Sequence, residues 1–174
     1  MLYYNGKAVL LIRNPFSAIL SMFRHRHFGF HSTSNLALKE DILGVFYVEK
    51  TSLYFTEKFQ KFANRAIEKW STIIEDWVSL GDVVVVHHED VLEDKIKEMR
   101  RILDFLRVKL EASRMNCLEF GNVDIFKRKS RSLPKSPFTR TLNKKIKNHI
   151  DRANDLLLKF KHPGIPYNKY KLYH

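Results

Sequence analysis

One stretch near the start of the chain restricts the possible fold more than any other. Residues 8–12 are all apolar, and Arg13, Asn14 and Pro15 follow them directly. An unbroken apolar run of this length is typical of a strand that is buried on both faces of a parallel sheet. Asn14 is a favourable helix cap, and Pro15 suits the first helical position. The sequence therefore predicts a buried strand over residues 8–13 that leads directly into a helix.

The junction between this strand and this helix also predicts a binding property. Backbone N–H groups and the positive end of the helix dipole converge at a helix N-terminus, so anions bind there readily. Arg13 adds a planar fork of hydrogen-bond donors that matches a phosphate group. We therefore expect a phosphate-bearing partner at Arg13, the alternative being a structural cation that caps the strand.

Apolar periodicity predicts most of the remaining secondary structure. Apolar residues that repeat at intervals of three and four indicate amphipathic helices, and Gly81 suits the end of the longest of them. A second buried strand is expected over Val83–Val86. The predicted helices cover residues 15–26, 56–80, 93–106, 111–118 and 139–160, and the predicted loops cover residues 24–35 and 121–140.

The order of these elements predicts an α/β domain of three layers around a parallel sheet. Two strands are fewer than a parallel sheet normally contains. Either strands are missing from this chain, or residues 36–53 hold strands that their pattern does not reveal. Without an internal repeat or a linker, residues 1–161 are expected to form one partial domain, followed by a tail over residues 162–174.

The residues at the end of the first strand resemble a known motif. Arg13-Asn14-Pro15, with Ser21 eight positions after the arginine, resembles the motif that binds the 3′-phosphate of 3′-phosphoadenosine 5′-phosphosulfate (PAPS) in PAPS-dependent sulfotransferases. In that family a strand ends in Arg-Asn-Pro, and a serine hydroxyl from the following helix adds a donor to the phosphate. The resemblance implies that Arg13 and Ser21 bind the 3′-phosphate, the alternative for Ser21 being a side chain that faces solvent.

The second predicted strand and the residues after it also resemble this family. His88-Glu89-Asp90 follows the strand, and residues 101–108 resemble the end of the family's next helix, with Arg107 in the place of a glycine. Residues 87–90 could provide a catalytic base. The alternative, which we favour, is a polar turn in which Glu89 or Asp90 caps the next helix.

A basic stretch later in the chain is the third point of resemblance. Residues 126–130 look like the late loop that folds over the 3′-phosphate in the family, with Ser130 where glycine is common. The resemblance implies that Lys127, Arg128 and Lys129 contact the nucleotide, the alternative being a solvated basic loop.

These motifs cover residues 8–153 and, with the long helix that carries Trp70 and Trp77, are most similar to the WSC-domain-containing branch of the family. The resemblance implies a P-loop-like sulfotransferase fold, with PAPS as the donor of a sulfuryl group to a hydroxyl or amine of a carbohydrate or other secretory acceptor. It also implies a protein on the lumenal side of the Golgi membrane, with its anchor outside this sequence; a cytoplasmic location is the alternative. No metal is expected, and no catalytic base is assigned.

The glycine-containing loop that holds the 5′-phosphosulfate in the family has no counterpart in this sequence. In the family it precedes the Arg-Asn-Pro strand by many residues, whereas only seven residues precede Ala8. We therefore expect the C-terminal part of a larger enzyme or a truncated product, inactive alone. The alternative function is a catalytically inactive module that binds a nucleotide or an anionic glycan.

Composition narrows the class of partner only in part. The net charge is +12 and the isoelectric point is about 9.8, which favours polyanionic or phosphorylated partners, although a basic surface can also serve solubility alone. No nucleic-acid-binding motif supports nucleic acid as the partner. Cys117 is the only cysteine, so no internal disulfide can form, and no apolar run is long enough to span a membrane.

Several residues invite a functional interpretation that the pattern does not support. His25, His27 and His31 lie in a predicted loop without the carboxylates that would complete a metal site. Trp70 and Trp77 lie on the apolar stripe of their helix, so we expect core packing rather than ligand stacking.

Overall fold

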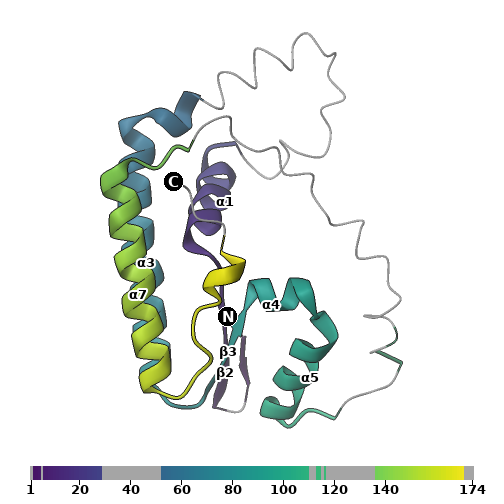
Figure 1. The fold of residues 1–174 in the computed structure, drawn as a ribbon. Helices are drawn as coiled ribbons and strands as arrows, with labels where there is room; N and C mark the ends of the chain where they lie inside the picture. The colour runs from purple at the N-terminus through teal and green to yellow at the C-terminus, as the bar shows by residue number, and fades with distance from the viewer. Residues whose placement is uncertain are drawn as a thin grey trace, which may run out of the picture. The chain divides into compact units, whose positions relative to one another are not determined.

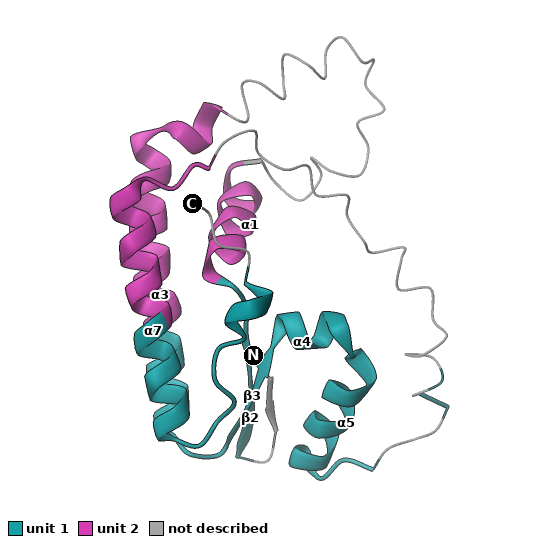
Figure 2. Ribbon diagram, viewed as in Figure 1, with its two compact units in different colours: residues 1–14, 72–131, 151–170 teal, residues 15–71, 132–150, 171–174 magenta. Residues whose placement is uncertain are grey.

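The computed structural model describes residues 2–4, 6–28, 52–109, 113, 114, 116 and 136–170, which are the coloured parts of Figure 1. They form two compact units, coloured in Figure 2. Unit 1 holds residues 1–14, 72–131 and 151–170, and unit 2 holds residues 15–71, 132–150 and 171–174. Most of the predicted loop after residue 28 and of the predicted helix over residues 111–118 lies outside the described residues, as do Cys117 and the greater part of the basic loop.

Unit 1 is built on a sheet of three strands in the order β1-β2-β3. These strands are β1 (Leu2–Tyr4), β2 (Lys7–Ile12) and β3 (Val83–His87). The two predicted strands are confirmed as β2 and β3, which pair in parallel from Ala8↔Val83 to Ile12↔His87. β1 pairs antiparallel with β2 and was not predicted. The sequence did carry a signal for it, because Asn-Gly at positions 5 and 6 between two apolar stretches is typical of a hairpin, and Gly6 has φ +78°.

Helices cover both faces of this sheet, as Figure 2 shows for unit 1. On one face, Val9, Val84 and Val86 pack against apolar residues of α4 (His88–Glu93) and α5 (Lys95–Leu106). On the other face lie the C-terminal parts of α3 (Glu57–Ser79) and α7 (Arg140–Lys159). This arrangement of helix, sheet and helix confirms the predicted α/β class. The buried residues of these helix parts are Ile74, Val78, Ala153 and Leu157.

An ion pair between Arg101 and the buried Glu98 covers the edge of β3 that faces away from β2. The Ala8 N–H donates to the Asp82 carbonyl, and carbonyls alternate in direction along a strand, so the Val85 carbonyl points away from β2. The Arg101 guanidinium donates to that carbonyl at 2.7 Å and to the Glu98 carboxylate at 2.6 Å. Glu98 is 6% exposed, and its charge is compensated by this pair. An edge whose carbonyl is already bonded to a side chain is less available for pairing with another strand.

Unit 2 is helical, and its core is aromatic. It contains α1 (Pro15–Phe28), the short η2 helix (Leu53–Phe55) and the N-terminal parts of α3 and α7. Phe23 lies at the centre, with the Phe59 ring 5.0 Å away in an edge-to-face arrangement and the Tyr54 ring 5.3 Å away. Phe138 packs against both Phe59 and Phe16. Such edge-to-face pairs are favourable beyond the area that they bury.

The predicted helices are confirmed with small differences at their ends. α1 extends to Phe28, so the prediction of a loop from Arg24 was wrong over the part that the structure describes. The predicted helix over residues 93–106 is α5, which begins two residues later because Asp94 caps it by accepting a hydrogen bond from the Lys97 N–H at 3.0 Å; Glu93 belongs to the preceding α4. None of the described helices combines the length and apolarity needed to cross a membrane.

The backbone is left-handed just after three of the described helices, at Gly81, Arg107 and Lys161. Gly81, after α3, has φ +87°, as the sequence predicts for a C-terminal cap. Arg107, at the end of α5, has φ 57° and ψ 35°, which is the conformation that a glycine adopts without strain. An arginine at this position therefore stores strain that the fold offsets elsewhere.

The variant Arg107→Gly should raise the free energy of unfolding by on the order of 0.5–1 kcal/mol. The left-handed backbone costs a non-glycine residue about 1–2 kcal/mol, and glycine removes this cost in the folded state. Glycine also gives the unfolded chain more conformational freedom, which offsets part of the stabilisation. Urea denaturation measures the difference. Gly81→Ala is the matched control and should lower stability, since an added Cβ there meets no neighbour within 4 Å and only the backbone is strained. An Arg107→Gly variant that is no more stable than the original chain would contradict this account.

Candidate functional site

The carboxyl ends of β2 and β3 lie side by side, because these parallel strands pair up to Ile12↔His87. The residues after each strand therefore share one edge of the sheet, which is where ligands bind in open α/β folds. Arg13 and Asn14 follow β2 and precede α1, while α4 begins at His88 directly after β3.

A hydrogen bond joins the two strand ends at this edge. The backbone N–H of Asn14 donates to Oε1 of Glu89 at 3.0 Å, and Asn14 is 2% exposed. A carboxylate that accepts from a backbone N–H makes a charge-assisted bond, stronger than a neutral one. Glu89 thus fixes the backbone of the residue that follows Arg13.

The predicted role of the polar residues after β3 was therefore wrong. Glu89 and Asp90 lie inside α4 rather than in a turn, and the residue that caps α5 is Asp94. α4 is only six residues long, too short for apolar periodicity to reveal. The signal that could have found Glu89 is its position, two residues after a strand that is parallel to the Arg13 strand.

Arg13 is half-buried and lies close to His88. Burial lowers the pKa of His88, and the positive charge of Arg13 lowers it further. A neutral imidazole beside a fixed guanidinium adds no second positive charge to the site. The guanidinium of Arg13 has the geometry to hold an anion at this edge.

His87 has a structural position. It is the last residue of β3, is 1% exposed, and its Nε2 lies 3.3 Å from the carbonyl oxygen of Pro163. Burial lowers its pKa, an effect that the Pro163 carbonyl and the carboxylates of Asp90 and Glu89 partly oppose. A neutral ring with its proton on Nε2 satisfies the carbonyl and leaves Nδ1 as an acceptor.

The other predicted site residues are divided between the units or lie outside the described residues. Ser21 is exposed on α1 in unit 2, whereas Arg13 belongs to unit 1. His25 and His27 lie in the last turn of α1 and not in a loop, and the His27 ring stacks on Phe23 at 4.1 Å. Lys127, Arg128, Lys129 and His31 lie outside the described residues.

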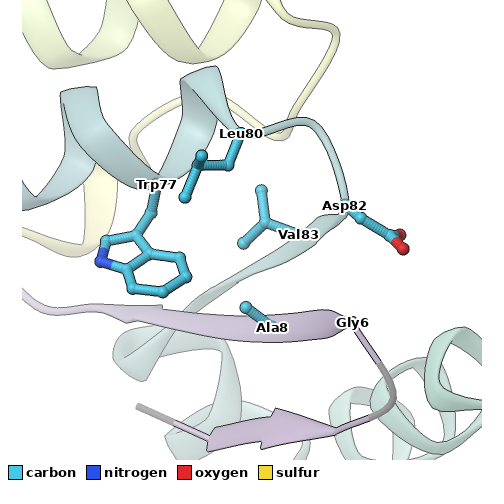
Figure 3. A pocket seen from close by; sticks show the side chains of 6 residues that line it. All are labelled: Gly6, Ala8, Trp77, Leu80, Asp82 and Val83. Atoms are coloured by element: carbon cyan, nitrogen blue, oxygen red, sulfur yellow. The ribbon is translucent and has the colours of Figure 1, made fainter.

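A small cavity of about 170 Å³ lies at the opposite end of the strands (Figure 3). Trp77, Leu80 and Val83 gather over Ala8, and the carboxylate of Asp82 points away from them. Trp77 is partly buried here, so its indole serves packing at the amino ends of the strands. Ligands of open α/β sheets bind at the carboxyl ends, and the cavity is thus no alternative to the Arg13 edge.

The positive charge of the chain is concentrated in unit 2. In unit 1, every described α-helix or part of an α-helix that carries cations also carries carboxylates. In the described residues of unit 2, the acidic side chains are Glu57 and Glu68 alone. Both are engaged, Glu57 with Lys61 and Glu68 with Lys145. The basic residues of unit 2 in the described part of the chain are Arg24, Arg26, Lys58, Lys61, Arg65, Lys69, Arg140, Lys144, Lys145 and Lys147.

Acidification should destabilise the fold as the pH falls through about 6.5. The pKa values of His87, His88 and His162 are all lowered, chiefly by burial. At a pH below the ordinary histidine pKa, the unfolded chain therefore binds more protons than the folded chain. Denaturation midpoints between pH 8 and pH 5.5 measure the loss. In His87→Gln, the amide can still donate to the Pro163 carbonyl but does not titrate, so stability should depend less steeply on pH. An unchanged dependence would contradict the role given to His87.

Comparisons with known proteins agree with the resemblance of the motifs. The family model described as "Sulfotransferase domain" matches residues 2–154. A WSCD family member of Drosophila melanogaster is 28% identical over 148 residues, covering 82% of this chain and 42% of that protein. Sulfotransferase 2A2 of Rattus norvegicus is 29% identical over 131 residues, covering 73% of this chain and 41% of that protein.

The chain thus spans about two fifths of the length of the curated relatives that it matches. No solved structure gives a significant match. Because the family model covers most of the chain, and Arg13-Asn14-Pro15 lies between a strand and a helix as expected, this chain belongs to the sulfotransferase family.

Proposed function

We propose that this chain is the part of a PAPS-dependent sulfotransferase that holds the 3′-phosphate of the nucleotide. The observation that carries the proposal is the position of Arg13, a half-buried guanidinium at the carboxyl end of paired parallel strands, two residues before α1 begins. The donor set suits a phosphate, since the guanidinium is a planar double donor and the helix start that follows favours an anion.

Each residue proposed for the site has a simple part in binding. Arg13 pairs with the 3′-phosphate, and Ser21 adds a hydroxyl donor from α1. Glu89 fixes the Asn14 backbone and with it the point from which the Arg13 side chain leaves the strand. The basic residues Lys127, Arg128 and Lys129 are proposed to close over the same phosphate.

PAPS supplies a sulfuryl group, and we propose that it passes to a hydroxyl or amine of a carbohydrate or other secretory acceptor. Such a transfer requires in-line positioning of donor and acceptor and stabilisation of the charge that develops on the bridging oxygen. The residues of this chain hold the adenosine end of the donor. They are proposed to supply the positioning, whereas the catalytic base and the loop around the 5′-phosphosulfate remain without a counterpart in this sequence.

The variant Arg13→Ala should weaken the binding of adenosine 3′,5′-bisphosphate by about 1.5–3 kcal/mol, the value of a hydrogen bond to a charged group. Titration calorimetry measures the change. Adenosine 5′-monophosphate lacks the 3′-phosphate, so the preference of the original chain for the bisphosphate should be smaller in the variant. Arg100→Ala removes an exposed arginine of α5 and should have no effect. Equal affinity in Arg13→Ala and in the original chain would refute the assignment.

A second candidate function, the binding of an anionic glycan, is favoured by the charge on unit 2. Lys58, Arg65 and Lys69 are exposed on α3 at helical spacing. α7 runs beside this part of α3 in the same direction, because Gln60 contacts Pro137 and Glu68 contacts Lys145 at the same sequence separation of 77. A row of cations along a helix pair attracts a linear polyanion.

Replacing Lys58, Arg65 and Lys69 by glutamine should lower the salt concentration at which the chain elutes from a sulfated-polysaccharide column. The matched control replaces Lys95, Lys97 and Arg100 of α5, which changes the net charge equally but on unit 1. Equal shifts in the two variants would indicate retention by net charge alone and would remove the support for a glycan-binding face.

A further inference from the structure

The last described segment of the chain, residues 162–170, contacts the strand ends and α4 within unit 1. The Ile165 N–H donates to the Asn154 side chain at 2.9 Å. A Cβ added at Gly164 would lie 2.9 Å from the same amide oxygen, so the segment lies too close to α7 for a side chain there. The Pro163 carbonyl lies 3.3 Å from Nε2 of His87. The segment is therefore held against the carboxyl end of β3.

The end of this segment is attached to α4. The ammonium group of Lys169 donates to Asp90 at 2.7 Å and also to Glu93. Asp90 and Glu93 lie on the same helix as Glu89, whose carboxylate accepts the Asn14 N–H. Lys169 thus bonds the same short helix that carries the partner of the Asn14 N–H.

Tyr170 follows Lys169, and Glu89 precedes Asp90, the residue that Lys169 bonds. Tyr170 is 5% exposed, and its hydroxyl oxygen is buried without a hydrogen-bond partner in the part of the chain that the structure describes. Oε2 of Glu89, the oxygen that does not bond Asn14, is also buried without a partner there. Burial raises the pKa of Tyr170, and the negative charge of Glu89 raises it further, as expected of neighbours.

A buried hydroxyl and a buried carboxylate oxygen that both lack partners need an explanation. The hydroxyl is a donor and the carboxylate oxygen is an acceptor, so the two groups are complementary partners. A carboxylate held at one oxygen by Tyr170 would keep its other oxygen directed at the Asn14 N–H.

We propose that residues 162–170 form a positioning element for the phosphate site, in which Lys169 holds α4 and the Tyr170 hydroxyl orients Glu89 toward the Asn14 backbone. Neither residue touches the nucleotide; both act through Glu89 on the backbone that carries Arg13. The statement about the nucleotide rests on the proposed function, whereas the statement about the Asn14 backbone does not.

The test is the variant Tyr170→Phe, which keeps the ring and removes only the hydroxyl. The first readout is the exchange rate of the Asn14 amide hydrogen, which reports the bond to Glu89 without any ligand. We expect exchange to accelerate about tenfold, as for the weakening of one charged hydrogen bond, in a chain whose circular dichroism shows that it remains folded. Unchanged exchange would overturn the proposal, whether or not the chain binds a nucleotide.

The second readout is the dissociation constant for adenosine 3′,5′-bisphosphate, which should rise about three- to tenfold in Tyr170→Phe. Faster Asn14 exchange in a chain that binds no bisphosphate would support the positioning role and refute the proposed function. Faster exchange with unchanged affinity would show that the positioning does not serve the phosphate, and would overturn that part of the proposal.

Two further variants separate positioning from packing. Tyr167→Phe removes a hydroxyl of the same segment that donates to Asp151 on α7 at 2.8 Å, and it should change neither readout. In a Glu89→Gln background, Tyr170→Phe should have little additional effect on Asn14 exchange, because residues in one network are not additive. Full additivity of the two substitutions would contradict action through Glu89.

Discussion

The parallel pairing of β2 with β3 is the constraint on which the rest of unit 1 depends. Parallel strands have no tight turn to fix them, so contacts between residues far apart in the sequence must hold their ends together. Apolar burial does this along the strands, where Val9 and Val84 pair and pack on the same face. At the carboxyl edge, the bond from Asn14 to Glu89 does it across 75 positions. The residues that follow the two strands are thereby placed at one edge of the sheet.

Much of the fold could be predicted because its main elements are long and periodic. α3 and α7 begin and end within one residue of the predicted bounds, and the buried positions of α7 are those of its apolar stripe. The elements that were missed are short. β1 has three residues and α4 has six, and neither offers enough residues for a period to be recognised. The left-handed backbone of Arg107 could not be predicted for a different reason, because arginine rarely adopts this conformation and glycine usually occupies such positions.

The candidate site was predictable only as far as residue types and spacing reach. Arg13 follows a strand and precedes a helix, which is a local pattern, and the structure places it at the end of β2 as expected. The partners that fix its surroundings come from other parts of the chain. Glu89 was assigned to a helix cap because its neighbours in sequence suggest one, whereas its carboxylate bonds the end of another strand. A partner chosen by tertiary contact carries no local signature, so sequence reasoning finds the cation and misses the carboxylate.

Buried polar atoms without partners gather at this same edge of unit 1. Nδ1 of His87, Oε2 of Glu89 and the hydroxyl of Tyr170 are all buried without hydrogen bonds among the described residues. Packed cores exclude such atoms because each lost bond to water must be replaced. An edge that only supported the sheet could be covered by apolar side chains at lower cost. The imidazole, the carboxylate and the phenol at this end of the sheet are therefore groups whose orientation, and not only whose burial, the fold has to set.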